Sequence, residues 1–255
     1  MLFRSRNILV KKVDGLATIT INRPEQMNTI SLDVIRELWN ALNSLEVARD
    51  VGVIILTGAG DRVFVAGADM EGLPGMSPLQ AINRARQGQA LTGKIEDSRK
   101  PVIAAVNGIA FGAGLEICLA CDLAIAAENA QFSLPEARLG FMPFWGGSQR
   151  LPRQIGKRRA KELILTGDVI DAARALELGL VNAVVPSARL HEEARGLASR
   201  ILRCGRVAVQ QAKAAIDGGM EMPLRQGLEL EATCLGVCFS TEEPARGIEE
   251  FLKED

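Results

Sequence analysis

Three apolar runs of strand length most constrain the fold of this chain. They cover residues 51–57, 101–106 and 122–127, and segments of small residues or of helical periodicity separate them. A continuous apolar run this short is typical of a strand that is buried on both faces, as in a parallel sheet covered by helices. The alternation of such strands with helices predicts an α/β fold.

The N-terminal region adds a hairpin and a helix. Residues 8–13 and 16–21 have strand character, and Asp14-Gly15 separates them, which predicts a β-hairpin. Ser31 can cap a helix in which apolar residues, Leu32 and Trp39 among them, recur at spacings of three and four.

The pattern becomes helical after about residue 155. Gly167 and Gly179 follow two predicted helices, and Asp171 can cap the second of them. The predicted helices cover residues 157–165, 172–178, 192–202, 207–216, 224–237 and 242–252. Apolar faces on such a helical tail need a partner surface, so we expect oligomerisation.

Charge and composition exclude several classes of partner. Lys+Arg 30 against Asp+Glu 31 leaves a net charge of −1, so no overall field attracts nucleic acid or an anionic membrane. Tyr is absent and aromatic residues make up 4% of the chain, which leaves few platforms for base stacking. No apolar run reaches the roughly 18 residues of a membrane helix. We expect no nucleic-acid or membrane partner, and a cytoplasmic protein or one whose targeting segment was removed.

The cysteines and the single histidine do not predict a metal or redox site. Cys118 and Cys121 form a C-x-x-C within an apolar helical run, but no second pair and no histidine is near. They are better interpreted as small buried hydrophobic residues, and reduced thiols agree with a cytoplasmic setting. His191 lies at a helix start away from the other motifs, which also disfavours a Ser-His-Asp hydrolase.

Two glutamates indicate proton-transfer chemistry. Glu116 has apolar neighbours on both sides, and a buried carboxylate is costly unless it is hydrogen-bonded or functional. Glu136 follows Pro135, where a solvated loop residue is the default interpretation. Two carboxylates in one cleft could divide acid and base roles, because like charges held close separate their pKa values.

Two loops of small residues could bind negative charge. Residues 112–114 precede the helix that carries Glu116, and residues 65–69 form a second such loop. Free N–H groups at a helix start can stabilise charge that develops on a substrate oxygen. One N–H from each loop would form an oxyanion hole, but tight packing turns explain the two loops equally well.

Short sequence blocks in a fixed order identify a family. They lie at residues 21–24 with Asn28, 64–70, 100–108, 112–116 with 121–122, 130–132 with 135–136 and 139–140, 146–151, 165–167 and 179–182. In these blocks the chain resembles the crotonase superfamily of enoyl-CoA hydratases and isomerases along nearly its whole length. The resemblance implies a spiral of β-β-α units over residues 1–190, followed by a helical region, residues 191–255, that trimerises, commonly as a dimer of trimers.

The resemblance also implies how a substrate is held. Members of the family bind acyl-CoA thioesters and hold the thioester oxygen with two backbone N–H groups, which here would belong to Ala68 and Ala113. The loop at residues 66–70, with Ala66, Asp69 and Met70, would wrap the coenzyme A part.

The same resemblance gives each glutamate a role. Glu116 would orient and activate a water molecule, and Glu136 would exchange the proton at the α-carbon and help to place the water. Family isomerases and several other branches keep only one of these carboxylates, so the presence of both favours hydration. The implied activity is the reversible syn hydration of a trans-2-enoyl-CoA to a 3-hydroxyacyl-CoA. It needs no cofactor, because coenzyme A is part of the substrate.

Alternatives remain on the same scaffold. They are dienoyl-CoA hydration, double-bond isomerisation, dehydration in a specialised pathway, and a non-enzymatic binding role. The neutral net charge and the glutamate pair count against the last of these.

Four residues depart from the family pattern. Ala113 stands where hydratases often have Gly, and Glu71 stands where many carry a Lys near the coenzyme phosphates. Phe144 and Trp145 stand where many have small residues. We predict that Trp145 or Phe144 contacts the substrate and favours a short, branched or cyclic acyl group, although either ring could pack in the core instead.

Overall fold

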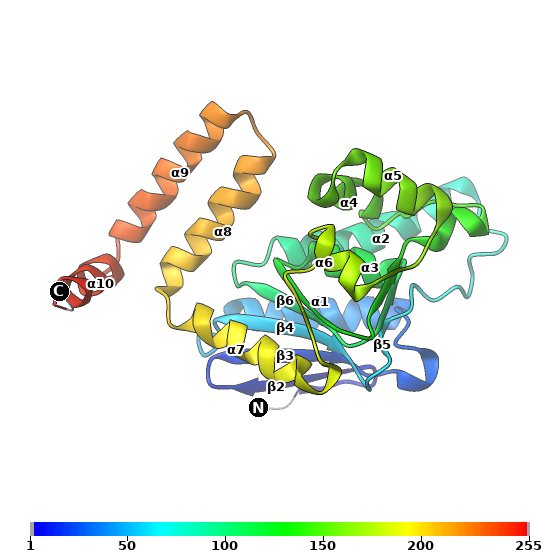
Figure 1. Ribbon diagram of the computed structural model, residues 1–255, viewed down its shortest axis with the longest axis horizontal. Coiled ribbons are helices and arrows are strands. Elements are labelled where there is room, and N and C mark those ends of the chain that lie inside the picture. The colour runs from blue at the N-terminus through cyan, green and yellow to red at the C-terminus, as the bar shows by residue number, and fades with distance from the viewer. Residues whose placement is uncertain (1–2, 254–255) are drawn as a thin grey trace.

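A computed structural model describes residues 3–253, which form two sheets and the helices around them (Figure 1). The large sheet contains, in spatial order, β1 (Phe3–Arg4), β2 (Ile8–Val13), β3 (Leu16–Ile21), β4 (Val53–Gly58), β6 (Val102–Val106), β8 (Leu123–Ala127) and β11 (Ala183–Val185). The small sheet contains β10 (Ile170–Asp171), β9 (Gln131–Ser133), β7 (Ile109–Phe111) and β5 (Val63–Val65). The predicted α/β class is confirmed.

The strands predicted from the sequence lie together in the large sheet. β2 and β3 pair antiparallel with Val13 opposite Leu16, as a tight hairpin requires. β3, β4, β6 and β8 are parallel neighbours, and every residue of β4 and β6 is buried. Burial on both faces explains why these strands read as continuous apolar runs.

The chain alternates between the two sheets. β4, β6 and β8 of the large sheet are each followed by a strand of the small sheet, namely β5, β7 and β9. Helices α2 (Pro78–Glu96) and α3 (Ala113–Ala120) follow the first two of these pairs. This repeat is the predicted spiral of β-β-α units.

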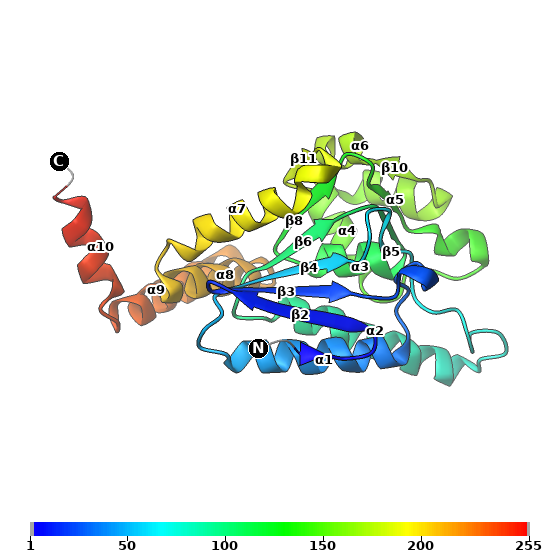
Figure 2. The same ribbon diagram turned by 90° about the horizontal axis from the view of Figure 1, so that it is seen from below.

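Helices cover both faces of the large sheet (Figure 2). The remaining helices are η1 (Pro24–Gln26), α1 (Leu32–Val47), η2 (Pro135–Leu139), α4 (Gly147–Ile155), α5 (Lys157–Thr166), α6 (Ala172–Glu177), η3 (Ser187–Arg189), α7 (Leu190–Leu202), α8 (Arg206–Met220), α9 (Leu224–Phe239) and α10 (Glu243–Phe251). On β4, Ile54 and Leu56 belong to the main core, which includes α1. Val53 and Ile55 belong to a second core with α7, so alternate side chains of one strand serve opposite faces.

The C-terminal helices divide into a packed part and a projecting part. α7 packs on the sheet through Leu190, Ala194 and Ala198. α8 and α9 lie side by side and extend away from the sheets (Figure 1). Lys213 of α8 forms an ion pair with Asp122 and donates a hydrogen bond to the backbone oxygen of Glu96, which ties α8 to the core. The division of the chain near residue 190 stays a prediction.

Two helices, α2 and α1, differ from the sequence expectations. Helix α2, although 19 residues long, was not predicted, because small and polar residues interrupt its buried face; the capping box of Ser77 and Gln80 was a usable signal. Helix α1 begins after its Ser31 cap as predicted. Leu32 and Trp39 were expected on its apolar face, but they are exposed by 53% and 38%, whereas Val34 and Leu38 between them are buried in the core. None of the helices between residues 3 and 253 has the length and apolar character of a membrane span.

Candidate active site

Glu116 is a fully buried carboxylate with two backbone donors. Helix α3 starts directly after β7, through Gly112 at φ 50°, and all of its residues are buried. The side chain of Glu116 is 1% exposed, and its Oε1 accepts hydrogen bonds from the N–H groups of Trp145 (2.7 Å) and Gly147 (2.8 Å). A carboxylate held in this way can stay charged in the core and keeps a fixed orientation.

Glu136 lies beside the start of the same helix. It belongs to η2 and is 6% exposed, so the default interpretation of a solvated loop residue is wrong. Its Oε1 lies 2.7 Å from the position that a Cβ atom on Gly112 would occupy. Its Oε2 is buried and has no hydrogen-bond partner among the described residues. This side chain therefore keeps one oxygen free for another molecule.

Burial raises the pKa of both carboxyl groups. Burial raises the pKa of Glu136 to about 7, and the nearby charge of Glu116 also raises it, whereas a hydrogen bond from its own backbone opposes them. Burial also raises the pKa of Glu116, but the N–H groups of Gly147 and Trp145 oppose this. Near neutral pH, Glu136 can carry a proton while the donors around Glu116 stabilise its charge.

The two small-residue loops meet at this point. A Cβ atom on Gly114 would lie 2.0 Å from the backbone oxygen of Val65, so only glycine lets α3 approach the loop after β5 this closely. The Cα atom of Gly67 lies 3.9 Å from the Cβ position of residue 112. The loop at residues 65–69 and the first turn of α3 are therefore in contact, as an oxyanion hole built from both would require.

The expected oxyanion donors have free N–H groups. The N–H of Ala66 donates to the backbone oxygen of Met27 (3.1 Å), and that of Asp69 donates to Ile30 (2.9 Å). Within residues 3–253, the N–H groups of Ala68 and Ala113 donate no hydrogen bond. Both are available to an oxygen atom of a bound molecule.

Comparison with known proteins identifies the family of this chain. The family model described as enoyl-CoA hydratase/isomerase matches residues 11–255. The chain belongs to this family.

Relatives match along nearly the whole chain. The crotonyl-CoA hydratase of Syntrophomonas wolfei is 42% identical over 248 residues, which are 97% of this chain and 95% of that protein. The short-chain-enoyl-CoA hydratase of Clostridium acetobutylicum is 39% identical over the same shares of the two chains. The solved structure of an enoyl-CoA hydratase from Bacillus anthracis superposes with a TM-score of 0.94 at 41% identity, covering 98% of this chain and 97% of that one. The resemblance and the fold inferred from the sequence blocks are confirmed.

The two bulky residues that depart from the family pattern differ in position. The Trp145 ring is 0% exposed and packs against α2, where a Cβ atom on Gly88 would lie 2.0 Å from its Nε1. Phe144 is partly buried and lines a cavity of about 350 Å³ together with Phe141 and Met142. The backbone of Trp145 holds Glu116, whereas Phe144 presents its side chain to the cavity.

Other family residues shape the site without reaching it. Asn107, at the turn between β6 and β7, accepts the N–H of Gly58 (3.1 Å) and donates to the backbone oxygens of Gly60 (2.8 Å) and Val63 (3.1 Å). It thereby fixes the start of β5, whose following loop carries Ala68. The sequence places this amide residue between an apolar strand and a glycine. Its hydrogen-bond partners could not be predicted, because they are far away in the sequence.

Cys118 and Cys121 pack as small hydrophobic residues, as predicted. Cys118 lies in the main core and Cys121 packs against it. Burial raises the pKa of the Cys118 thiol to about 12, so it is not a thiolate at neutral pH. In the part of the chain that the structure describes, no three His, Cys, Asp or Glu side chains gather as a metal site would need.

Proposed function

We propose that this protein catalyses the reversible syn addition of water to a trans-2-enoyl-CoA, giving a 3-hydroxyacyl-CoA. The observation that carries the proposal is the pair of buried carboxyl groups at the start of α3. Glu116 is held by two N–H donors, and Glu136 has a raised pKa and a free oxygen. The names of the relatives support the reaction, since they describe a crotonyl-CoA hydratase and a short-chain-enoyl-CoA hydratase.

The thioester would be activated by the backbone. Its carbonyl oxygen would accept hydrogen bonds from the N–H groups of Ala68, on the loop at residues 65–69, and of Ala113, in the first turn of α3. Negative charge grows on this oxygen as water adds to the double bond. One preorganised donor at such an oxygen contributes on the order of 10²–10³ in rate. The coenzyme A part would lie along the loop that includes Ala66, Asp69 and Met70.

The glutamates would transfer the protons. Glu116 accepts a proton from the water that attacks the β-carbon, and Glu136 donates its proton to the α-carbon. In the reverse direction both transfers reverse. General acid–base help of this kind is typically worth about 10²–10⁴ in rate. After each addition a proton returns from Glu116 to Glu136 through solvent, which restores the starting state. No step changes an oxidation state, so we predict that no cofactor is needed.

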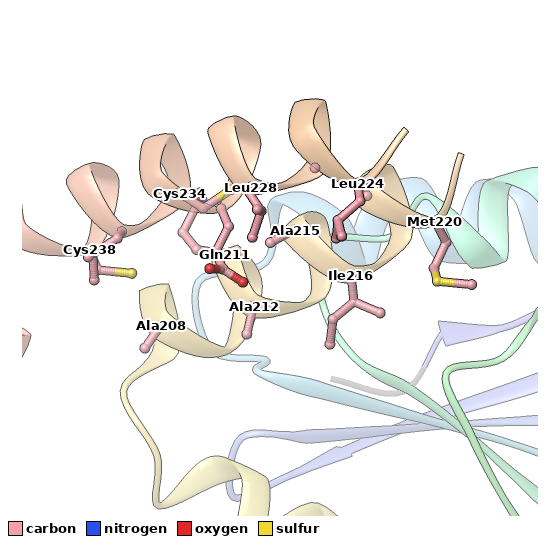
Figure 3. A pocket seen from close by; sticks show the side chains of 14 residues that line it. Ala208, Gln211, Ala212, Ala215, Ile216, Met220, Leu224, Leu228, Cys234 and Cys238 are labelled. Atoms are coloured by element: carbon pink, nitrogen blue, oxygen red, sulfur yellow. The ribbon is translucent and has the colours of Figure 1, made fainter. Parts of the chain in front are cut away.

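The C-terminal helices would form the contacts between subunits. Their exposed apolar residues include Ile216 (65%), Met220 (75%), Leu224 (78%) and Leu228 (52%). They line an apolar groove of about 570 Å³ between α8 and α9 (Figure 3). Apolar surface of this extent is rarely left in water. We propose that it is covered in a homotrimer or a dimer of trimers, and that the protein is cytoplasmic.

A panel of acyl-CoA thioesters tests the proposed reaction. Crotonyl-CoA should gain one water by mass and lose the absorbance of its conjugated thioester. Activity on a 3-enoyl-CoA, with no change in crotonyl-CoA, would instead assign isomerisation. Sedimentation of the wild type and of Leu228→Asp tests the assembly, which should dissociate in the variant.

A further inference from the structure

The cavity beside the active site contains one charged side chain. Its walls come from the segment after the loop at residues 65–69, from α2, and from the segment before Trp145. Leu73, Met76 and Ala81 line one part, and Phe141 and Phe144 line another. Arg84 is the only ionisable residue among those that line it. The cavity is thus an apolar space of about 350 Å³ with a cationic group in its wall.

Arg84 has no hydrogen-bond or ion-pair partner among residues 3–253. Its side chain belongs to a residue that is 8% exposed, and its Nη1 is buried without a hydrogen bond. Within residues 3–253, Arg84 forms no ion pair. Burial lowers the pKa of Arg84 and the charge of Asp69 opposes this, but the Asp69 carboxylate accepts the N–H of Glu71 and forms no ion pair with Arg84. A guanidinium whose Nη1 is buried without a hydrogen bond carries a desolvation cost, which an anion bound in the cavity would offset.

The cavity lies where the far end of an acyl group would extend. Gly88, one turn along α2 from Arg84, packs against Trp145, whose N–H holds Glu116. Phe144 precedes Trp145 and accepts a hydrogen bond from Gln89 of α2 (3.0 Å). The carboxylate of Glu116 and the cavity therefore share the segment of residues 144–145 as a common wall.

We propose that Arg84 is a specificity-determining residue that binds a carboxylate at the distal end of the acyl group. The preferred substrate would then be the monothioester of an unsaturated dicarboxylic acid, and this inference rests on the proposed function. A guanidinium binds a carboxylate through two parallel hydrogen bonds, which fixes both its position and its direction. The apolar walls would contact the methylene groups between the double bond and the carboxylate.

Two substrates of equal length test the inference. Both are six-carbon trans-2-enoyl-CoA thioesters, one ending in a methyl group (2-hexenoyl-CoA) and the other in a carboxylate (2-hexenedioyl-CoA). In the wild type, kcat/KM should be at least about tenfold higher for the dicarboxylic thioester, since a charge-assisted pair distinguishes them. Arg84→Met should lower that ratio by at least about tenfold, mainly through KM, and Arg84→Lys should retain part of the preference. Arg86→Met is the matched control, because Arg86 is exposed on the same helix, and it should leave the ratio unchanged.

A binding measurement separates this inference from the proposed reaction. The saturated thioesters hexanoyl-CoA and adipyl-CoA cannot be hydrated, so their Kd values by calorimetry report on Arg84 even if no enoyl thioester is turned over. Tighter binding of adipyl-CoA to the wild type, lost in Arg84→Met, would support the role of Arg84 independently of hydration. The inference is overturned if the wild type does not favour the dicarboxylic member of either pair, or if Arg84→Met leaves the preference unchanged while its Tm shows a folded protein.

Discussion

The Oε1 atom of Glu136 lies 2.7 Å from the position that a Cβ atom on Gly112 would occupy. Gly112 also has φ 50° and ψ −120°, a backbone conformation that favours glycine. The missing side chain therefore has two consequences. It lets the chain turn from β7 into α3, and it leaves room for the second carboxylate beside the helix that carries Glu116.

Substitution of this glycine should damage the site. In Gly112→Ala the added methyl group would strain the backbone and displace the Glu136 carboxylate, so we expect kcat to fall by at least about tenfold. Gly179→Ala is the control, because Gly179 has φ 76° and an added Cβ atom would meet no atom within 4 Å. This variant is therefore strained without displacing a catalytic group. Steady-state hydration of crotonyl-CoA compares the two, and equal kcat values would disprove the argument.

Each glutamate should be required for turnover. Glu116→Gln and Glu136→Gln should each lower kcat by at least about tenfold, because each removes one proton-transfer group. The double variant should lose less than the product of the two single effects if the carboxyl groups act as a unit. Initial rates with all three variants measure this, and near-wild-type kcat in either single variant would rule out the paired mechanism.

The raised pKa of Glu136 should make stability depend on pH. Its pKa moves from an ordinary value of 4.5 to about 7 on folding, so the folded state binds more protons between these values. The free energy of unfolding should therefore fall as pH rises from about 4.5 to about 7. Glu136→Gln should remove this dependence and be more stable than the wild type above pH 7, by on the order of 1–3 kcal/mol. Urea unfolding at pH 5 and pH 8 measures it.

The control for this measurement is Glu71→Gln, a substitution at an exposed loop glutamate. It should leave the difference in the free energy of unfolding between pH 5 and pH 8 as in the wild type.

The ionisation of Glu136 should also act on catalysis, because Glu136 must be protonated to donate to the α-carbon. Hydration kcat/KM should therefore decline as pH rises above about 7, and a profile that is flat through pH 9 would contradict the assigned role.

Trp145 and Phe144 should differ in what their removal changes. Trp145→Ala should cost about 3–5 kcal/mol of stability, because a fully buried ring leaves a cavity against α2. Trp39→Ala is the control at a ring that is 38% exposed, with an expected cost below about 1 kcal/mol.

Phe144→Ala should instead change the dependence of kcat/KM on acyl-chain length. A chain-length profile unchanged in Phe144→Ala would remove Phe144 from the acyl site.

Much of the fold followed from local patterns. The hairpin of β2 and β3, the buried strands β4, β6 and β8, and the Ser31 cap of α1 were all predicted, because each depends on residues close together in the sequence. Helix α2 was missed because its buried face includes Gly88 and Arg84, which do not form an apolar stripe. A helix that packs against one large ring through a glycine has no periodic apolar signal.

The sequence by itself determined the α/β class, the family and the two candidate carboxylates, since ordered blocks and apolar periodicity are properties of the chain alone. Only the tertiary structure decided that Glu136 is buried beside Gly112 and that Trp145 supports Glu116 through its backbone. It also decided that Arg84 faces a cavity with no partner in the described part of the chain. The reason is physical. Burial and charge pairing depend on which distant segments meet, and these contacts form only when the two sheets and α2 pack together.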